Sequence, residues 1–162
     1  MSSPVRYTRA QIALHWLIVI LVAVQFLTAE AMEEFFDKAE DAGVLAGFPT
    51  SSGAIAHALG GGLILVLMVY RIWLRWSYGA PLLPANMKPI LQLAARVTHA
   101  GFYVLLVLLP LTGAAALYIN SEAGDVHGAI KSVLILLIAV HVAGAVVHAF
   151  VYKDDVLRRM IP

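Results

Sequence analysis

The sequence predicts an all-α membrane protein, a bundle of four transmembrane helices. Of its 162 residues, 61% are hydrophobic and 13% are charged, whereas globular domains average about 45–50% apolar and about 25% charged residues. Four apolar stretches reach the length of about 20 residues that a helix needs to cross a hydrocarbon core. Stretches such as WLIVILVAVQF are apolar on every side, whereas the helices of a soluble bundle keep a polar face. We expect one domain over residues 1–162, embedded in a lipid bilayer.

The predicted spans follow one another along the chain. They cover about residues 11–32, 53–73, 90–118 and 127–152. The third is the longest, and Pro110 within it predicts a kink. Residues 29–31 (Ala-Glu-Ala) resemble a signal-peptide cleavage site. We nevertheless expect the first span to be retained as an anchor, because its apolar region is longer than the about 7–15 residues of a signal peptide.

Lys and Arg residues are unevenly distributed between the two sides of the predicted bundle. Nine of the 11 lie before the first span, in the second connection or after the fourth span, and Lys38 and Lys131 lie on the other side. The positive-inside rule therefore predicts cytoplasmic termini. The outer side carries the acidic stretch AEAMEEFFDKAEDAG, which we expect to be a solvated loop, with a short interfacial helix as the alternative.

Other classes of protein and cofactor are excluded by composition. The net charge of +1 and the lack of a basic run argue against a nucleic-acid partner. The chain has no cysteine, which excludes disulfides, iron–sulfur clusters, thiolate haem ligation and covalent c-type haem.

All six histidines lie inside or at the end of a predicted span. A histidine within a membrane is energetically costly and indicates a functional site. By position, His57 and His127 begin the second and fourth spans at the outer side, whereas His15 and His141 lie in the cytoplasmic half. The sequence therefore predicts two histidine pairs at two depths, with the fourth helix contributing to both.

Paired imidazoles without carboxylates favour haem iron over a bare metal ion. Both residues three and four positions after His57 are glycine, and Gly144 and Ala145 follow His141 at the same spacing. A flat macrocycle can approach the backbone there, although small residues also serve plain helix packing. A zinc or non-haem iron site needs more ligands at one depth, and Asp and Glu are absent from the membrane interior. We therefore predict two b haems.

His99 and His148 remain outside these pairs, in the cytoplasmic half of the bundle. Each is predicted to bond a haem propionate or a quinone carbonyl, or to be a satisfied interfacial histidine. Arg9 and Arg71 fall near the same depth and could neutralise a propionate or a quinone. His148 also competes with His141 for the inner iron.

Several stretches together resemble the prokaryotic cytochrome b561 family. They are YTRAQIALHWLIVIL, HALGGGLILVLMVYRIWLR, ARVTHAGFYVLLVLLPLTG, the start of the fourth span and KDDVLRRMIP, and they cover nearly the whole chain apart from the acidic stretch. The resemblance implies a diheme four-helix protein, related to the cytochrome b subunits of formate dehydrogenases and nickel–iron hydrogenases. It implies that His15 and His141 ligate the inner haem, and that His57 and His127 ligate the outer haem.

The resemblance also implies a function. Members of the family exchange electrons with ubiquinone near the cytoplasmic haem, and some are superoxide oxidases. We expect a quinone-linked oxidoreductase of the bacterial inner membrane that takes electrons from a periplasmic donor, with superoxide as one candidate. Lys131, four residues after His127, is predicted to attract an anionic donor or to contact a propionate. Two alternatives are an electron-relay anchor subunit for a separate dehydrogenase and a non-redox scaffold. No side chain is singled out as catalytic.

Overall fold

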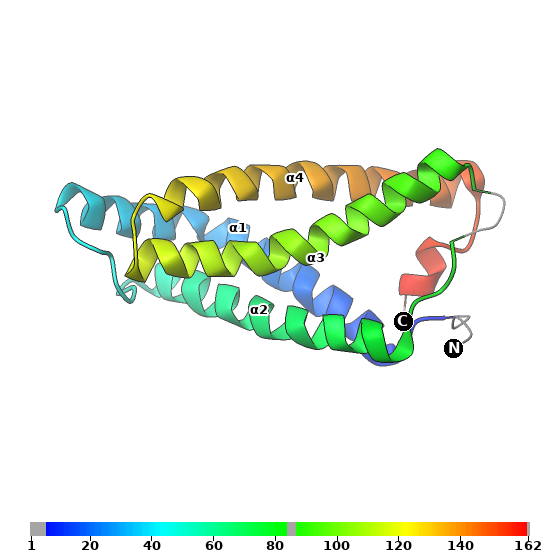
Figure 1. Ribbon diagram of the computed structural model, residues 1–162, viewed down its shortest axis with the longest axis horizontal. Helices are drawn as coiled ribbons and strands as arrows, with labels where there is room; N and C mark the ends of the chain where they lie inside the picture. The colour runs from blue at the N-terminus through cyan, green and yellow to red at the C-terminus, as the bar shows by residue number, and fades with distance from the viewer. Residues whose placement is uncertain (1–5, 84–86, 162) are drawn as a thin grey trace.

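The computed structural model describes residues 6–83 and 87–161, and four long helices dominate this part of the chain (Figure 1). Their bounds are α1 (Arg9–Asp41), α2 (Ser52–Tyr78), α3 (Pro89–Tyr118) and α4 (Ala123–Val147). A π-helical turn η1 (His148–Tyr152) and a short 3₁₀ helix η2 (Leu157–Met160) follow. All four helices are long and apolar enough to cross a membrane, and no strand occurs in the described residues. The predicted fold class, an all-α four-helix membrane bundle, is confirmed.

The ends of the helices follow from local chemistry. Thr8 caps α1 in a reciprocal arrangement: its hydroxyl accepts from the Gln11 N–H at 3.2 Å, and the Gln11 side chain accepts from the Thr8 N–H at 2.9 Å. Ser51 caps the start of α2. Gly79 follows its last residue as the C-cap, with a φ of 70° that glycine adopts without a Cβ clash. α3 begins at Pro89, where the missing N–H costs no hydrogen bond.

The acidic stretch is helical and not the solvated loop that the sequence analysis expects. α1 continues through it to Asp41, because residues 32–41 contain no glycine or proline and an i,i+4 pair joins Glu34 to Lys38 at 2.6 Å. With 33 residues, α1 is about 50 Å long, which exceeds the about 30 Å of a hydrocarbon core. The projecting part packs on the start of α4, where the Phe36 ring lies so close to Gly124 that a Cβ there would come within 3.1 Å.

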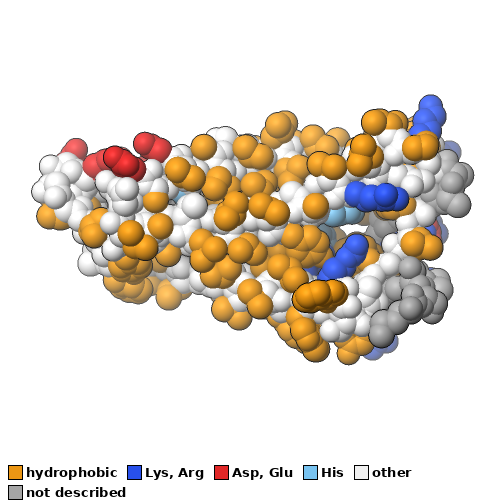
Figure 2. Space-filling model, viewed as in Figure 1, with side chains coloured by type: hydrophobic (Ala, Val, Ile, Leu, Met, Phe, Trp, Pro, Cys, Tyr) orange, Lys and Arg blue, Asp and Glu red, His pale blue; other side chains and the backbone are white. Residues whose placement is uncertain are grey.

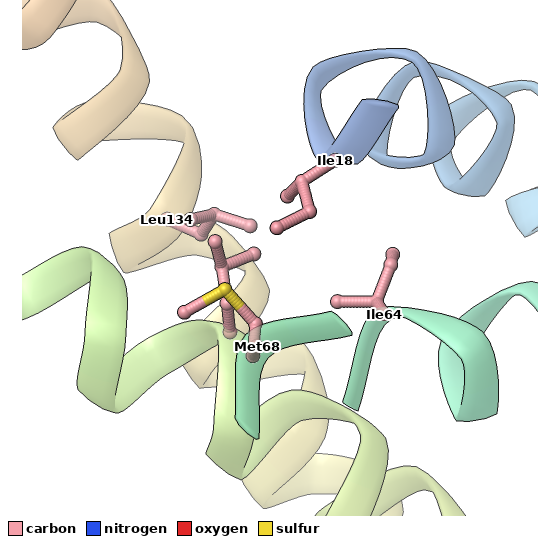
Figure 3. Close-up of a cluster of buried hydrophobic side chains, with 5 residues drawn as sticks. Ile18, Ile64, Met68 and Leu134 are labelled. Carbon is pink, nitrogen blue, oxygen red and sulfur yellow. The ribbon is translucent and has the colours of Figure 1, made fainter. Parts of the chain in front are cut away.

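A small buried cluster joins the four helices midway along the bundle. Ile18 of α1, Met68 of α2 and Leu134 of α4 are 5%, 1% and 4% exposed, and Ile64 and Leu106 complete the cluster (Figure 3). Leu134 lies seven residues from both His127 and His141. The cluster therefore separates the two levels at which α4 carries histidines.

The helices pack unevenly. Close backbone packing joins α1 to α2, α2 to α3 and α3 to α4, whereas α1 and α4 approach each other less closely. At the end of the bundle where the chain begins and ends, the α1–α2 pair diverges from the α3–α4 pair, and η2 lies in the opening (Figure 1). The Trp16 indole N–H donates to the Met160 carbonyl at 2.7 Å and holds η2 against α1.

Charge divides the molecule along its long axis. Acidic side chains gather at the end where α1 projects, Lys and Arg gather at the other end, and hydrophobic side chains cover the surface between them (Figure 2). We call these the acidic end and the basic end. Trp73 and Trp76 of α2, 52% and 87% exposed, lie toward the basic end, as aromatic residues do at a membrane interface.

Candidate functional site

A cavity at the acidic end brings together His57 of α2 and His127 of α4. Its volume is about 630 Å³, within the range of about 300–1,000 Å³ that is typical of cofactor and ligand sites. All four helices supply its walls, which are largely apolar, and Lys131 also lines it. The structure thus places these three predicted site residues around one space.

Two acceptors from α3 orient the imidazole of His127. Its Nδ1 lies 2.9 Å from the Leu109 carbonyl oxygen and 3.3 Å from the Thr112 hydroxyl oxygen. A carbonyl oxygen can only accept, so Nδ1 carries the proton and Nε2 keeps a free lone pair. Metal-ligating histidines are usually held in this way, by a hydrogen bond from the nitrogen that does not bind the metal. Gly113 leaves room for the ring, because a Cβ there would lie 3.3 Å from it.

The imidazole of His57 has the same tautomer. Its Nδ1 lies 3.2 Å from the Thr28 hydroxyl oxygen, and that hydroxyl donates its own hydrogen to the Val24 carbonyl at 2.8 Å. The hydroxyl oxygen therefore accepts from Nδ1–H, and Nε2 is again the free acceptor. With its amide nitrogen facing His57, the Gln25 side chain lies 3.3 Å from this Nε2 and accepts from the Gly61 N–H at 3.2 Å. A ligand that takes Nε2 has to displace this flexible amide.

Three imidazoles meet at the basic end. The ring of His141 in α4 lies 6.4 Å from that of His15 in α1 and 5.7 Å from that of His99 in α3, measured between centroids. The Phe102 ring packs against His141 at 5.2 Å. None of these three histidines has a side-chain hydrogen bond to another described residue. Two imidazoles bound on opposite sides of a metal through bonds of about 2 Å have centroids about 6 Å apart, and the His15–His141 and His99–His141 separations are both close to this value.

Arginines surround the imidazoles at the basic end. Arg71 donates to the Gln11 carbonyl at 3.0 Å, and Gln11 donates to the Gly79 carbonyl at 3.0 Å, which ties the start of α1 to the end of α2. Arg71 lies near both His15 and His99, and Arg75 lies near His99. Arg9, in contrast, is exposed on the first turn of α1 and has no side-chain hydrogen bond within the described residues. Of the two predicted arginines, Arg71 is the one that lies beside the histidines.

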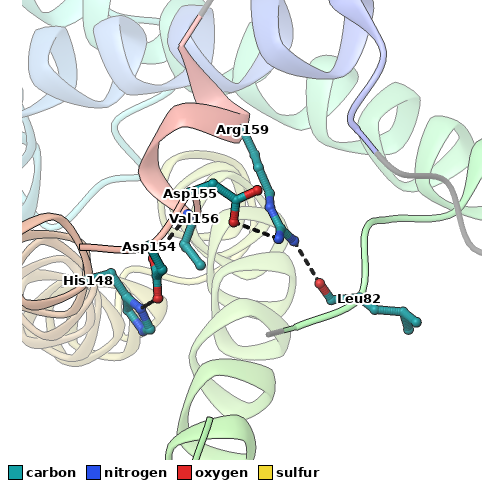
Figure 4. Close-up of polar contacts among 6 residues, drawn as sticks. All are labelled: Leu82, His148, Asp154, Asp155, Val156 and Arg159. Atoms are coloured by element: carbon teal, nitrogen blue, oxygen red, sulfur yellow. Dashed lines mark hydrogen bonds and ion pairs between the residues drawn. The ribbon is translucent and has the colours of Figure 1, made fainter. Parts of the chain in front are cut away.

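His148 lies apart from this group. It begins η1, and its Nδ1 is 2.6 Å from a carboxylate oxygen of Asp154 (Figure 4). The sequence left open whether His141 or His148 faces His15. The structure brings the His141 ring to His15 and pairs His148 with a carboxylate instead.

A family model described as prokaryotic cytochrome b561 matches residues 6–162. The chain belongs to this family. The resemblance that the sequence suggested is therefore confirmed. As a cytochrome b561, the chain is a multi-pass membrane protein with a role in electron transfer, and the family implies binding of haem b.

Relatives of known name match over almost their whole length. "Cytochrome b562" of Cereibacter sphaeroides is 33% identical over 96% of this chain and 94% of its own. "Probable superoxide oxidase CybB" of Yersinia pestis is 28% identical over 97% and 96%. "Cytochrome b561 homolog 1" of Escherichia coli K12 is 25% identical over 97% of each chain. The similarity to a superoxide oxidase indicates an oxidoreductase role for this cytochrome b561.

The residues present fit haem. Within the described residues, no three His, Cys, Asp or Glu side chains are grouped as a site for a metal ion, whereas histidine pairs occur at both ends of the bundle. A haem iron needs only two axial ligands from the protein, because the macrocycle supplies the rest of its coordination. The unprotonated Nε2 atoms at the acidic end and the ring separations at the basic end are compatible with this requirement.

Sequence reasoning overlooked the polar side chains that hold the histidines. Thr28, Thr112 and Gln25 lie in apolar stretches of α1 and α3, and Asp154 follows η1. A polar residue within a membrane span is itself a sign of function. The histidines meet this criterion, and so do the threonines and the glutamine that accompany them.

Proposed function

We propose that this cytochrome b561 holds two b haems and carries electrons between a one-electron donor at the acidic end and ubiquinone at the basic end. The observation that supports this best is the placement of two imidazole pairs at opposite ends of the bundle, each with one member on α4. His127 and His141 are 14 residues apart, or about 21 Å along the helix. Bound haem supplies reversible one-electron chemistry at its iron, and the protein supplies the ligands and their surroundings.

In this proposal, His57 and His127 ligate the outer haem through Nε2. Their Nδ1 protons are already engaged by Thr28 and by the Leu109 carbonyl. The cavity between them has the volume of a cofactor site. Bringing haem to His57 moves the Gln25 amide away from Nε2.

His15 and His141 ligate the inner haem. The separation of their rings fits this pairing, and α1 and α4 approach each other less closely than the other neighbouring helices do. Arg71 supplies a positive charge for a propionate. His99 also contacts His141, but it is exposed, and we assign it to the propionate or quinone side of this haem.

Superoxide is the first donor to test, because one relative is named as a probable superoxide oxidase. Lys131 is the one cation among the described side chains that line the outer cavity, but Glu33, Asp37, Glu40 and Asp125 line it too. Acidic groups around an opening slow the approach of an anion, and salt relieves this effect. If superoxide is the donor, haem reduction should become faster as ionic strength rises. A cationic protein donor should show the opposite dependence.

At the basic end, we propose that His148 contacts the quinone. It follows His141 by seven residues, which places it about 10 Å further along the helix axis. His148→Ala should keep both haem spectra but slow reoxidation of the reduced protein by ubiquinone analogues. Unchanged reoxidation with both haems intact would remove His148 and leave His99 as the better candidate.

We further propose that the protein lies in the bacterial inner membrane with its basic end in the cytoplasm. The basic end carries the described residues at both ends of the chain (Figure 1), and the positive-inside rule supports its cytoplasmic location. A reporter that is active only in the periplasm should be silent when it is fused to the C-terminus. Strong activity would reverse the orientation.

The decisive experiment is haem quantitation of the purified protein by the pyridine haemochrome assay, together with a reduced-minus-oxidised spectrum. We expect two low-spin b haems per chain, and one or none would overturn the proposal. Stopped-flow mixing with superoxide and with a ubiquinone analogue then tests the reaction. A diheme protein that reacts with neither would be an electron-relay subunit for a separate dehydrogenase.

A further inference from the structure

A partly buried carboxylate–imidazole pair lies at the basic end, outside both proposed haem ligand pairs. The Nδ1 of His148 is 2.6 Å from Oδ2 of Asp154, and the two side chains are only 16% and 22% exposed. The other carboxylate oxygen, Oδ1, accepts from the Val156 N–H at 3.1 Å (Figure 4). Both oxygens of Asp154 are therefore engaged, one by the backbone and one by the imidazole.

The shape of the backbone brings Asp154 back to the histidine. α4 widens into the π-helical turn η1 at His148, and the next residue after η1, Lys153, adopts a left-handed conformation with φ 51°. The N–H groups of Lys153 and Asp154 both point back to the His148 carbonyl, the second at 3.3 Å. This reversal places the carboxylate six residues later in sequence against the ring. Single π-helical turns of this kind occur frequently at functional sites.

The segment that carries Asp154 is anchored to the rest of the bundle. Arg159 pairs with Asp155 at 2.8 Å and donates to the Leu82 carbonyl at 2.7 Å (Figure 4). The Trp16 indole holds the Met160 carbonyl. Asp154 is thus fixed relative to α1 and to the segment after α2, and so is the orientation of the imidazole that it holds.

We propose that Asp154 is a positioning residue that keeps a proton on Nδ1 of His148, so that Nε2 is the nitrogen that exchanges protons with the quinone. This inference rests on the proposed quinone function. Nε2 has no hydrogen-bond partner among the described residues, and the nearest titratable ring is that of Tyr152, 5.4 Å away. The other charged groups of the segment are Lys153, Arg158 and the Asp155–Arg159 pair.

The proton balance follows from this arrangement. Reduction of a quinone to a quinol takes two electrons, which the cytochrome delivers one at a time, and two protons. With each electron, the doubly protonated ring of His148 gives its Nε2 proton to a quinone oxygen. It keeps the proton on Nδ1, which stays hydrogen-bonded to Asp154. Nε2 then takes a new proton from cytoplasmic water. The Asp154 carboxylate stabilises the cationic ring in each cycle, as carboxylates do for histidines that act as acids and bases.

The chain offers a matched pair of variants, Asp154→Asn and Asp155→Asn. In Asp154→Asn, the amide oxygen can keep the Val156 N–H, which turns the amide nitrogen toward His148. An amide nitrogen donates, so it should force the ring proton onto Nε2. Asp155 is the neighbouring carboxylate, but its side chain is 64% exposed and pairs with Arg159 and not with the histidine.

The first measurement is ¹⁵N NMR of histidine-labelled protein in the reduced state at alkaline pH, where a neutral ring carries a proton on one nitrogen only, with the His148 signals assigned by their loss in His148→Gln. Wild type and Asp155→Asn should show the Nδ1–H tautomer, and Asp154→Asn should show the Nε2–H tautomer. The second measurement is reoxidation by a ubiquinone analogue. Asp154→Asn should lower kcat by up to about 100-fold, the lower end of what a positioned proton donor contributes, and change KM little. Asp154→Glu should restore part of the rate.

The outcomes separate this inference from the quinone proposal. An unchanged tautomer in Asp154→Asn overturns the inference. So does an unchanged reoxidation rate in Asp154→Asn when His148→Gln is slow, and in that case the quinone role of His148 stands. If His148→Gln itself reoxidises at the wild-type rate with both haems present, the quinone role of His148 fails and the inference fails with it. Should Asp154→Asn not fold, Asp154→Glu must keep the Nδ1–H tautomer, and loss of that tautomer overturns the inference.

Discussion

At the acidic end, His57 and His127 stand across a cavity of about 630 Å³, and each has a hydrogen-bond acceptor on Nδ1. At the basic end, His15, His99 and His141 contact one another through their rings, and the structure shows no hydrogen bond from these rings to a described residue. The first set is oriented by the surrounding helices. The second set is restrained by ring packing between helices that diverge (Figure 1).

The contrast indicates two ways of preparing a ligand site. Hydrogen bonds at Nδ1 select one tautomer and one ring direction before any ligand arrives. Ring packing leaves the direction of the lone pair to be set by the ligand. We therefore expect the acidic end to respond to changes in the residues that hold its histidines, and the basic end to respond chiefly to changes in the histidines themselves.

The largest expected effect is the loss of one haem of two. His57→Ala and His127→Ala should remove the same outer haem, and His15→Ala and His141→Ala should remove the inner one, because each pair serves one iron. Haem content per chain and the low-spin spectrum measure this, and His99→Ala serves as the control that keeps both haems. Loss of the inner low-spin signal in His148→Ala, and not in His141→Ala, would contradict the ligand assignment.

The next prediction compares Thr28 and Thr112, the two threonines that contact the outer histidines. Thr28→Val removes the acceptor that His57 Nδ1 has among the described residues, and we expect about 10–100-fold weaker haem binding at this site. Thr112→Val should cost less, because the Leu109 carbonyl still accepts from His127 at 2.9 Å. Titration of haem into the apoprotein measures both affinities. Equal losses would show that hydrogen bonding at Nδ1 does not distinguish these sites.

A smaller effect should come from crowding the His127 ring. In Gly113→Ala, the new Cβ would lie 3.3 Å from the imidazole, so the ring must shift by a few tenths of an ångström. The outer haem should show altered EPR g-values and a shifted potential, while the inner haem is unchanged. The inner haem of the same protein is the internal control. A change in the inner haem instead would place His127 at the wrong end.

The smallest expected effect concerns pH and the C-terminal segment. The hydrogen bond from Arg159 lowers the pKa of Asp155 below its ordinary value, and the Arg159 charge adds to this effect. Because the pKa of Asp155 is lowered in the folded state, its ionised form stabilises the docked segment at pH values above the ordinary pKa. This contribution disappears as the pH falls below about 4. Hydrogen exchange of residues 155–161, expressed relative to the rate of an unprotected amide at the same pH, should therefore rise at pH 3 in the wild type. In Asp155→Asn, the same exchange should already be raised at pH 7, and only slightly, because exposed ion pairs contribute little.

The fold class could be predicted from the sequence because hydropathy and length alone determine which helices can cross a membrane. Counting residues also places His15 and His141 at one level, and the structure brings their rings within 6.4 Å. Counting could not place His99, because its contact with His141 depends on how α3 packs beside α4. The depth of a residue follows from its position along one helix, whereas contact between two side chains depends on how two helices pack.

Other features needed the backbone itself. The approach of Asp154 to His148 depends on a π-helical turn and a left-handed lysine, and neither has a clear sequence pattern. The helical extension of α1 differs in this respect. Residues 32–41 contain no glycine or proline, and this is visible in the sequence. Their acidic charge alone does not prevent a helix.

The position of α4 also has a consequence for how the protein is made. This helix is the last of the four to leave the ribosome, and it carries one histidine of each pair. Neither ligand pair therefore exists while the first three helices wait in the membrane. Under the proposed ligand assignment, haem would bind at either site only after α4 has been translated. In this proposal, haem binding waits for the insertion of α4.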